Sequence, residues 1–239
     1  MLRWVTRGTL VGAALAVVAV ALTGTGPTRA TDPVSTPPAR AAALSTATTA
    51  LPAYTASIRT IDAALAYRMR YSWRSGCPVP LSDLRYLRMT YLGFDGLAHS
   101  GEMVVHRVYA ANVVAAFRRV YASRFPIRAM RLVDVYLGSD AASMNADNTS
   151  AFNCRRTTSG TAWSQHSYGR AIDVNPIENP YVSGGTVEPA AGRSYLTRWP
   201  LRKGMLTWTV RDAFHDIGWY WGGSWSSLKD YMHFSSNNR

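Results

Sequence analysis

Two residues with metal-binding side chains, His166 and Asp173, lie seven positions apart in the stretch SQHSYGRAIDVN (164–175). The segment after the histidine is polar and contains glycine, whereas the aspartate lies in a short apolar run. Alternation along residues 171–175 puts Ile172 and Val174 on one face of a strand, so Asp173 points to the other face, into a cleft. A buried acid is costly unless a partner compensates its charge. Because imidazole nitrogen and carboxylate oxygen are both zinc ligands, we expect the two residues to share a metal ion.

The third ligand is expected at His233, in the segment LKDYMHFS. Two histidines and one aspartate leave one position of a zinc ion open for water, as in catalytic rather than structural sites. Asp230 precedes His233 by three residues and is placed to accept a proton from that water. A carboxylate beside a metal and its water is the usual arrangement for metal-assisted amide hydrolysis.

Simpler explanations compete for each of these residues. Asp173 could pair with a nearby arginine, although this does not account for the apolar strand around it. Asp230 could form a surface ion pair with Lys229, which would contribute less than about 1 kcal/mol. Ser164 or Ser167 could serve as a nucleophile, but the sequence contains no GxSxG elbow.

The motifs SQHSYGRAIDVN, GWYWGGSW (218–225) and KDYMHF (229–234) occur in this order. Together they resemble the zinc peptidases that cut peptidoglycan stem peptides, the D-Ala-D-Ala carboxypeptidases and their L-Ala-D-Glu endopeptidase relatives. The resemblance extends from Gly76 through FDGLAHSGEMVVH, FNCRR and NPYV to residue 239. It implies Zn²⁺ on His166, Asp173 and His233, with Asp230 as the catalytic base. It also implies an α+β fold of the hedgehog/DD-peptidase type, in which helices flank a small antiparallel sheet.

The resemblance further implies an arginine that binds and polarises the substrate. This role falls on Arg155, with Arg156 as the rival, and we expect Ser164, Trp221 and Trp225 to contact the substrate as well. The ligands alone do not separate a D-Ala-D-Ala carboxypeptidase from an L-Ala-D-Glu endopeptidase. A zinc-containing module that binds peptidoglycan without cutting it is a further alternative, as is a basic wall-binding protein whose histidines are incidental.

Hydrophobic periodicity predicts the elements that must position these side chains. Helices are expected over 57–72, 104–123 and 205–217, and strands over 84–94, 130–138, 171–175 and 231–235. Helices come first and short strands are interleaved later, which favours an α+β fold over a doubly wound sheet.

The first 30 residues are predicted to be an export signal. Arg3 and Arg7 precede an apolar run from Leu10 to Leu22, which is shorter than the roughly 20 residues of a membrane span. Cleavage is expected after Ala30, and an uncleaved anchor is the alternative. Residues 31–55 are rich in Pro, Thr and Ala and are predicted to be a linker, so the zinc peptidase domain would cover 56–239.

Export would place the protein outside the cytosol, as a secreted or cell-wall protein. Cys77 and Cys154 can then form a disulfide, with two buried thiols as the alternative. The whole chain carries a formal net charge of +12, and loss of the signal leaves 23 basic and 14 acidic residues, or +9. Such a charge suits a peptidoglycan substrate among anionic cell-wall polymers. Nucleic acid is not expected as a partner, because the arginines are scattered and no nucleic-acid motif occurs.

Overall fold

The computed structural model describes residues 21, 24, 50–157 and 160–239. These residues belong almost entirely to one compact unit, Thr48–Arg239. The other unit, Met1–Ala47, contains the expected signal peptide and most of the expected linker, which lie outside the described residues apart from Ala21 and Gly24. Within the described part of the chain, no helix has the length and apolar character needed to cross a bilayer.

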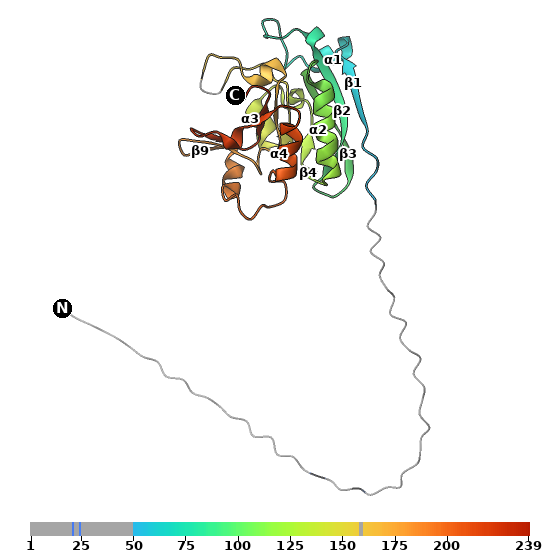
Figure 1. Cartoon of the computed structure of the whole chain (residues 1–239), viewed down its shortest axis with the longest axis vertical. Helices are drawn as coiled ribbons and strands as arrows, with labels where there is room; N and C mark the ends of the chain where they lie inside the picture. Colours follow the sequence, from blue (N-terminus) through green and yellow to red (C-terminus); the bar gives the residue numbers. More distant parts are fainter. Residues whose placement is uncertain (1–20, 22–23, 25–49, 158–159) are drawn as a thin grey trace, which may run out of the picture. The chain divides into compact units, whose positions relative to one another are not determined.

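Three antiparallel strands form the largest sheet: β1 (Ala56–Thr60), β2 (Leu84–Gly93) and β3 (Ala98–His106), in the order β1-β2-β3. A short strand, β4 (Pro126–Ile127), adds to β2 in parallel. Helix α2 (Ala110–Ala122) packs on β2, and α4 (Trp208–His215) packs against α2 (Figure 1). The Phe117 and Phe214 rings meet edge to face, with centroids 5.7 Å apart, so the two helices share one apolar core.

Two smaller sheets lie in the C-terminal half of the unit. One has the order β10-β12-β7, with β10 (Tyr220–Trp221), β12 (His233–Ser235) and β7 (Ala171–Asp173). The other has the order β11-β8-β9, with β11 (Lys229–Asp230), β8 (Tyr181–Ser183) and β9 (Thr186–Glu188). Both sheets are antiparallel, as the α+β class requires.

The remaining elements are short. They are the parallel pair β5 (Ala129–Met130) and β6 (Asn148–Thr149), the helices α1 (Ala63–Arg68) and α3 (Asp140–Asn145), and the 3-10 turns η1 (Leu81–Asp83), η2 (Val133–Tyr136), η3 (Gln165–Tyr168), η4 (Ala190–Tyr195) and η5 (Gly222–Ser224).

Apolar residues of the β10-β12-β7 sheet anchor it in the core. Ile172 on β7 and Phe234 on β12 are directly opposite each other and fully buried. Phe234 also stacks on Phe214 of α4, with ring centroids 4.2 Å apart. Because side chains alternate along a strand, the neighbouring pair on these two strands faces away from this core.

Several predicted elements are confirmed and others are wrong. The strands near 84–94, 171–175 and 231–235 and the helix within 205–217 are present, with shorter bounds. The helix expected over 57–72 begins only at Ala63, because residues 56–60 pair as β1 with the edge of β2. The helix expected from residue 104 begins at Ala110, because the preceding residues complete β3.

The strand predicted over 130–138 is also wrong. Only Ala129–Met130 is extended, and η2 follows. The carboxylate of Asp134 accepts hydrogen bonds from the backbone N–H groups of Tyr71 and Ser72, at 2.8 and 2.9 Å. These long-range bonds tie η2 to the loop after α1.

The disulfide between Cys77 and Cys154 is present, with the two Cα atoms 5.9 Å apart. It joins the loop after α1 to the segment that leads toward η3. Cys154 is buried in a second apolar cluster with Leu84, Val104 and Phe152. The bond therefore attaches the site-bearing half of the chain to the first sheet.

Candidate metal centre and active-site cleft

The pairing of β7 with β12 brings two of the expected ligands together. Asp173 and His233 are directly opposite in the register, one position beyond the buried Ile172–Phe234 pair, so their side chains share the face that points away from the core. The Nδ1 atom of His233 lies 3.0 Å from Oδ1 of Asp173. Both residues are only 6% exposed.

The third expected ligand, His166, is carried by η3. The Ser164 side chain caps this turn by accepting a hydrogen bond from the His166 N–H. Gly169 ends it with a φ of 64°, and a Cβ there would come within 2.5 Å of the His106 backbone nitrogen. The turn directs Nε2 of His166 to 3.1 Å from Oδ2 of Asp173.

Each histidine has one ring nitrogen facing Asp173 and the other bonded to a carbonyl. Nδ1 of His166 lies 2.6 Å from the Ala151 carbonyl oxygen, and Nε2 of His233 lies 2.9 Å from the Arg239 oxygen. Because a carbonyl oxygen only accepts, these nitrogens carry the protons, and the nitrogens that face Asp173 are left to coordinate. Metal-ligating histidines are commonly oriented in this way.

The donor set fits a metal ion. One potential ligand atom from each of His166, Asp173 and His233 lies within 4.8 Å of the other two, and all three residues are buried. Burial alone would raise the pKa of Asp173, but the two histidines hold that pKa well below its usual range. Burial opposes protonation of His233, yet the hydrogen bond and charge of Asp173 raise its pKa to about 9. The carboxylate thus attracts positive charge, which a bound cation would supply in place of the proton.

Asp230, the expected base, lies on β11 and lines the same cleft. Its Oδ1 atom is shielded from solvent and has no hydrogen-bond partner among the described residues. Burial of the carboxyl group, with a contribution from the charge of Asp173, raises the pKa of Asp230 to about 7. A pKa near neutrality suits a group that must accept a proton and return it.

The two candidate arginines have different surroundings. Arg155 lines the cleft, and its Nη2 atom lies 2.7 Å from Oδ2 of Asp140 at the start of α3. Its Nε atom is shielded from solvent and has no partner among the described residues. Arg156 is exposed, stacks over the Trp163 ring and donates to the Thr161 carbonyl. The structure therefore brings Arg155, rather than Arg156, to the metal-binding residues.

The cleft itself has a volume of about 350 Å³. Ser164 and Trp225 line it, and the Trp225 ring centroid lies 5.6 Å from that of His233. Trp221, also expected at the substrate, is not part of the lining. Its Nε1 donates to the Tyr231 carbonyl, and its ring packs beside the Arg211 guanidinium.

The sequence did not predict several residues of the cleft, among them Asp140, Tyr181 and Glu188. Tyr181 and Glu188 lie on the β8–β9 hairpin, whose turn contains Gly184 and Gly185 at φ values of 52° and 83°. A Gly-Gly pair between alternating residues is a recognised hairpin signal, so YVSGGTVE could have predicted this element. Asp140 carries no comparable signal.

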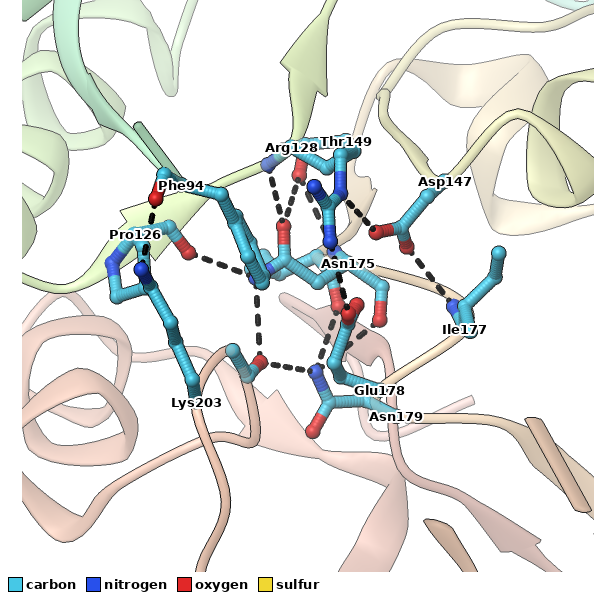
Figure 2. A network of polar contacts seen from close by, with 12 residues as sticks. Phe94, Pro126, Arg128, Asp147, Thr149, Asn175, Ile177, Glu178, Asn179 and Lys203 are labelled. Carbon is cyan, nitrogen blue, oxygen red and sulfur yellow. Dashed lines mark hydrogen bonds and ion pairs between the residues drawn. The ribbon is translucent and has the colours of Figure 1, made fainter. Parts of the chain in front are cut away.

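A buried polar network supports the backbone after Asp173 (Figure 2). The Asn175 amide nitrogen donates to the carbonyl oxygens of Pro126 and Gly204, at 2.8 and 3.1 Å, and the amide oxygen accepts from the Arg128 N–H at 3.2 Å. Nδ2 of Asn179 donates to the carbonyl oxygens of Val174, Asn175 and Gly204. These bonds hold the end of β7, and therefore Asp173, in place.

Two acids lie buried in the same network (Figure 2). Arg128 faces both: its Nε is 3.5 Å from Oδ2 of Asp147, and its Nη2 is 3.7 Å from Oε1 of Glu178. Burial raises the pKa of Glu178 to about 8, and the hydrogen bond and charge of Asp147 add to the effect. Burial and the neighbouring acid therefore favour the protonated form of Glu178.

Comparison with known proteins agrees with this geometry. A family model described as D-alanyl-D-alanine carboxypeptidase matches residues 157–236. This segment is similar to that family. The match covers about a third of the chain and includes His166, Asp173, Asp230 and His233, whereas Arg155 lies just before it. Searches of curated proteins and of solved structures give no match for the chain.

The fold is of the α+β class, and the part of the chain that is similar to the carboxypeptidase family carries the candidate metal centre. The matched segment contains η3, β7, β12 and the β11-β8-β9 sheet, which are the elements that carry the metal-binding residues and Asp230.

Proposed function

We propose that this chain is a secreted zinc peptidase that hydrolyses an amide bond of peptidoglycan stem peptides, with D-alanyl-D-alanine carboxypeptidase activity as the first choice. The observation that carries the proposal is the convergence of His166, Asp173 and His233 in a cleft that also contains the unpartnered carboxylate of Asp230. A pure binding module would not need such an acid beside the metal-binding residues.

His166, Asp173 and His233 would hold the zinc ion, since two imidazole nitrogens and a carboxylate oxygen are a donor set that zinc prefers. When bound, zinc supplies a Lewis acid that polarises a carbonyl oxygen and lowers the pKa of water. The bonds from the histidines to the Ala151 and Arg239 oxygens keep the coordinating nitrogens aimed at Asp173.

Three side chains around this centre transfer the proton, stabilise the developing charge and position the arginine. Asp230 accepts the proton of the attacking water and later returns it to the leaving amine. Arg155 stabilises the negative charge that develops on the carbonyl oxygen, or binds a carboxylate of the substrate. Asp140 holds the Arg155 guanidinium in the cleft through their ion pair.

An L-Ala-D-Glu endopeptidase activity is the second candidate, because the cleft continues into a neighbouring hollow. A neighbouring hollow of about 560 Å³ shares Asp140, Met144, Arg155 and Glu188 with the cleft. Its extent leaves room for further residues of a substrate. Export to the cell wall follows in this proposal from the basic and apolar N-terminal residues, and the net positive charge suits anionic wall polymers as surroundings.

The test compares the full chain with its Asp230→Ala variant on purified muropeptides, analysed by mass spectrometry. The wild type should release D-alanine or new amino termini, whereas Asp230→Ala should keep its zinc but lose about a hundredfold or more in rate, as expected for loss of a general base. Asp212→Ala, an exposed change on α4, serves as the control. Unchanged turnover of the Asp230 variant would reject the role given to this residue.

A further inference from the structure

A row of three side chains crosses the β11-β8-β9 sheet. Asp230 on β11 is directly opposite Tyr181 on β8, and Tyr181 is directly opposite Glu188 on β9. Residues directly opposite on antiparallel strands point to the same face of a sheet. All three accordingly line the cleft, which places Glu188 on the wall that carries the proposed base.

The acids of the cleft differ in their partners. Asp173 faces two histidines, and Asp140 pairs with Arg155. The side chain of Glu188 forms neither a hydrogen bond nor an ion pair with any residue that the structure describes. Asp230 and Glu188 are the two acids lining the cleft that form no ion pair with a described residue, and Asp230 already has the role of the proposed base. The position of Glu188 in the cleft suggests that its partner is part of the substrate.

Glu188 also lies where the cleft opens into the neighbouring hollow, because it lines both. The charged groups shared by the two spaces are Asp140, Arg155 and Glu188, which together carry one net negative charge. Two strand spacings of about 4.8 Å separate Glu188 from Asp230, or about 10 Å in all. This distance corresponds to roughly three residues of extended peptide at about 3.3 Å each, or fewer residues and one long side chain.

We propose that Glu188 is a specificity-determining residue that binds an ammonium group of the substrate, carried by a residue about two positions from the cleaved amide. The inference rests on the proposed function and narrows its substrate class to peptides with a cationic amino-acid side chain. Glu188 makes a charge-assisted hydrogen bond to this ammonium group and takes no part in the proton transfers at Asp230.

The test uses two synthetic stem pentapeptides that differ only in the amine of the third side chain, free in one and acetylated in the other. Binding to the full chain is measured by tryptophan fluorescence, since Trp225 lines the cleft. Release of D-alanine is measured separately. The wild type should bind the free-amine peptide about tenfold more tightly, which is the size expected for one hydrogen bond to a charged group. Glu188→Gln should remove this preference by weakening only the free-amine peptide, whereas Glu188→Asp should keep part of it.

The two readouts separate the two proposals. Equal binding of both peptides by the wild type, or an intact preference in a folded Glu188→Gln variant, would overturn the role of Glu188 even if D-alanine is released. A preference that depends on Glu188, without release of D-alanine, would support the role of Glu188 and reject the proposed carboxypeptidase activity.

Discussion

Replacing Glu178 with glutamine should change how the stability of the protein depends on pH. Glu178 is 1% exposed and lies beside Asp147, which is 3% exposed. Burial raises its pKa to about 8, from an ordinary value of 4.5, and the hydrogen bond and charge of Asp147 add to this rise. The Oε2 atom of Glu178 has no hydrogen-bond partner among the described residues, and a backbone hydrogen bond and the charge of Arg128 are what favours the ionised form.

The sign follows from proton linkage. Between about pH 4.5 and pH 8 the folded chain keeps a proton that the unfolded chain has released. The contribution of this proton to the free energy of unfolding is therefore fully present below pH 4.5 and is lost as the pH rises through 8. The free energy of unfolding should fall by at most about 1.4 kcal/mol per pH unit in this window. From about pH 6 to about pH 7.5 the wild type should therefore lose about 1–2 kcal/mol relative to Glu178→Gln, whose side chain does not titrate.

Urea unfolding of the wild type and Glu178→Gln at these two pH values, with the disulfide intact, measures the difference. Glu188→Gln is the matched control, because it removes a partly exposed carboxylate that forms no ion pair with a described residue. It should follow the wild type. If the wild type and Glu178→Gln differ by the same free energy at both pH values, the buried pair is not the source of the dependence.

Two further predictions concern stability. Replacing Cys77 and Cys154 with serine opens a link between residues 77 positions apart, which should cost about 2–5 kcal/mol and lower the unfolding midpoint by calorimetry; an unchanged midpoint would show that the bond contributes nothing. Asn175→Ala should cost about 3 kcal/mol in urea unfolding, because the partly buried backbone groups of Pro126 and Arg128 lose their partner and the Gly204 carbonyl keeps only Asn179. Asn145→Ala, an exposed change on α3, should be nearly neutral, and equal effects of the two changes would contradict the role of the network.

The sequence was most informative where local pattern and spacing determine the structure. The alternation around Asp173 predicted both the strand and the face of the aspartate, and the three expected ligands do converge. The sequence was least informative where the secondary structure depends on pairing between strands that are distant in the chain. Apolar residues in 57–61 have helical spacing, yet residues 56–60 form β1 because they pair with the edge of β2. The apolar run before Ala110 fits a helix or a strand equally well, and pairing with β2 makes it β3.

The walls of the cleft could be predicted only in part. Asp140 pairs with Arg155 because α3 begins beside the cleft, and no motif in the sequence indicates this position of the helix. Tyr181 and Glu188 reach the cleft because β8 pairs with β11, where Asp230 lies opposite Tyr181, 49 positions earlier. Trp221 and Trp225 are four residues apart and look equivalent in sequence, but the turn η5 between them leaves only Trp225 in the cleft.

The metal content of the full chain tests the central claim most directly. Zinc should be present at one ion per chain in the wild type and absent from Asp173→Asn, which keeps the shape of the side chain but removes the negative charge that faces both histidines. Circular dichroism verifies that the variant is folded. No zinc in the wild type, or equal zinc in both proteins, would contradict a metal centre built from His166, Asp173 and His233.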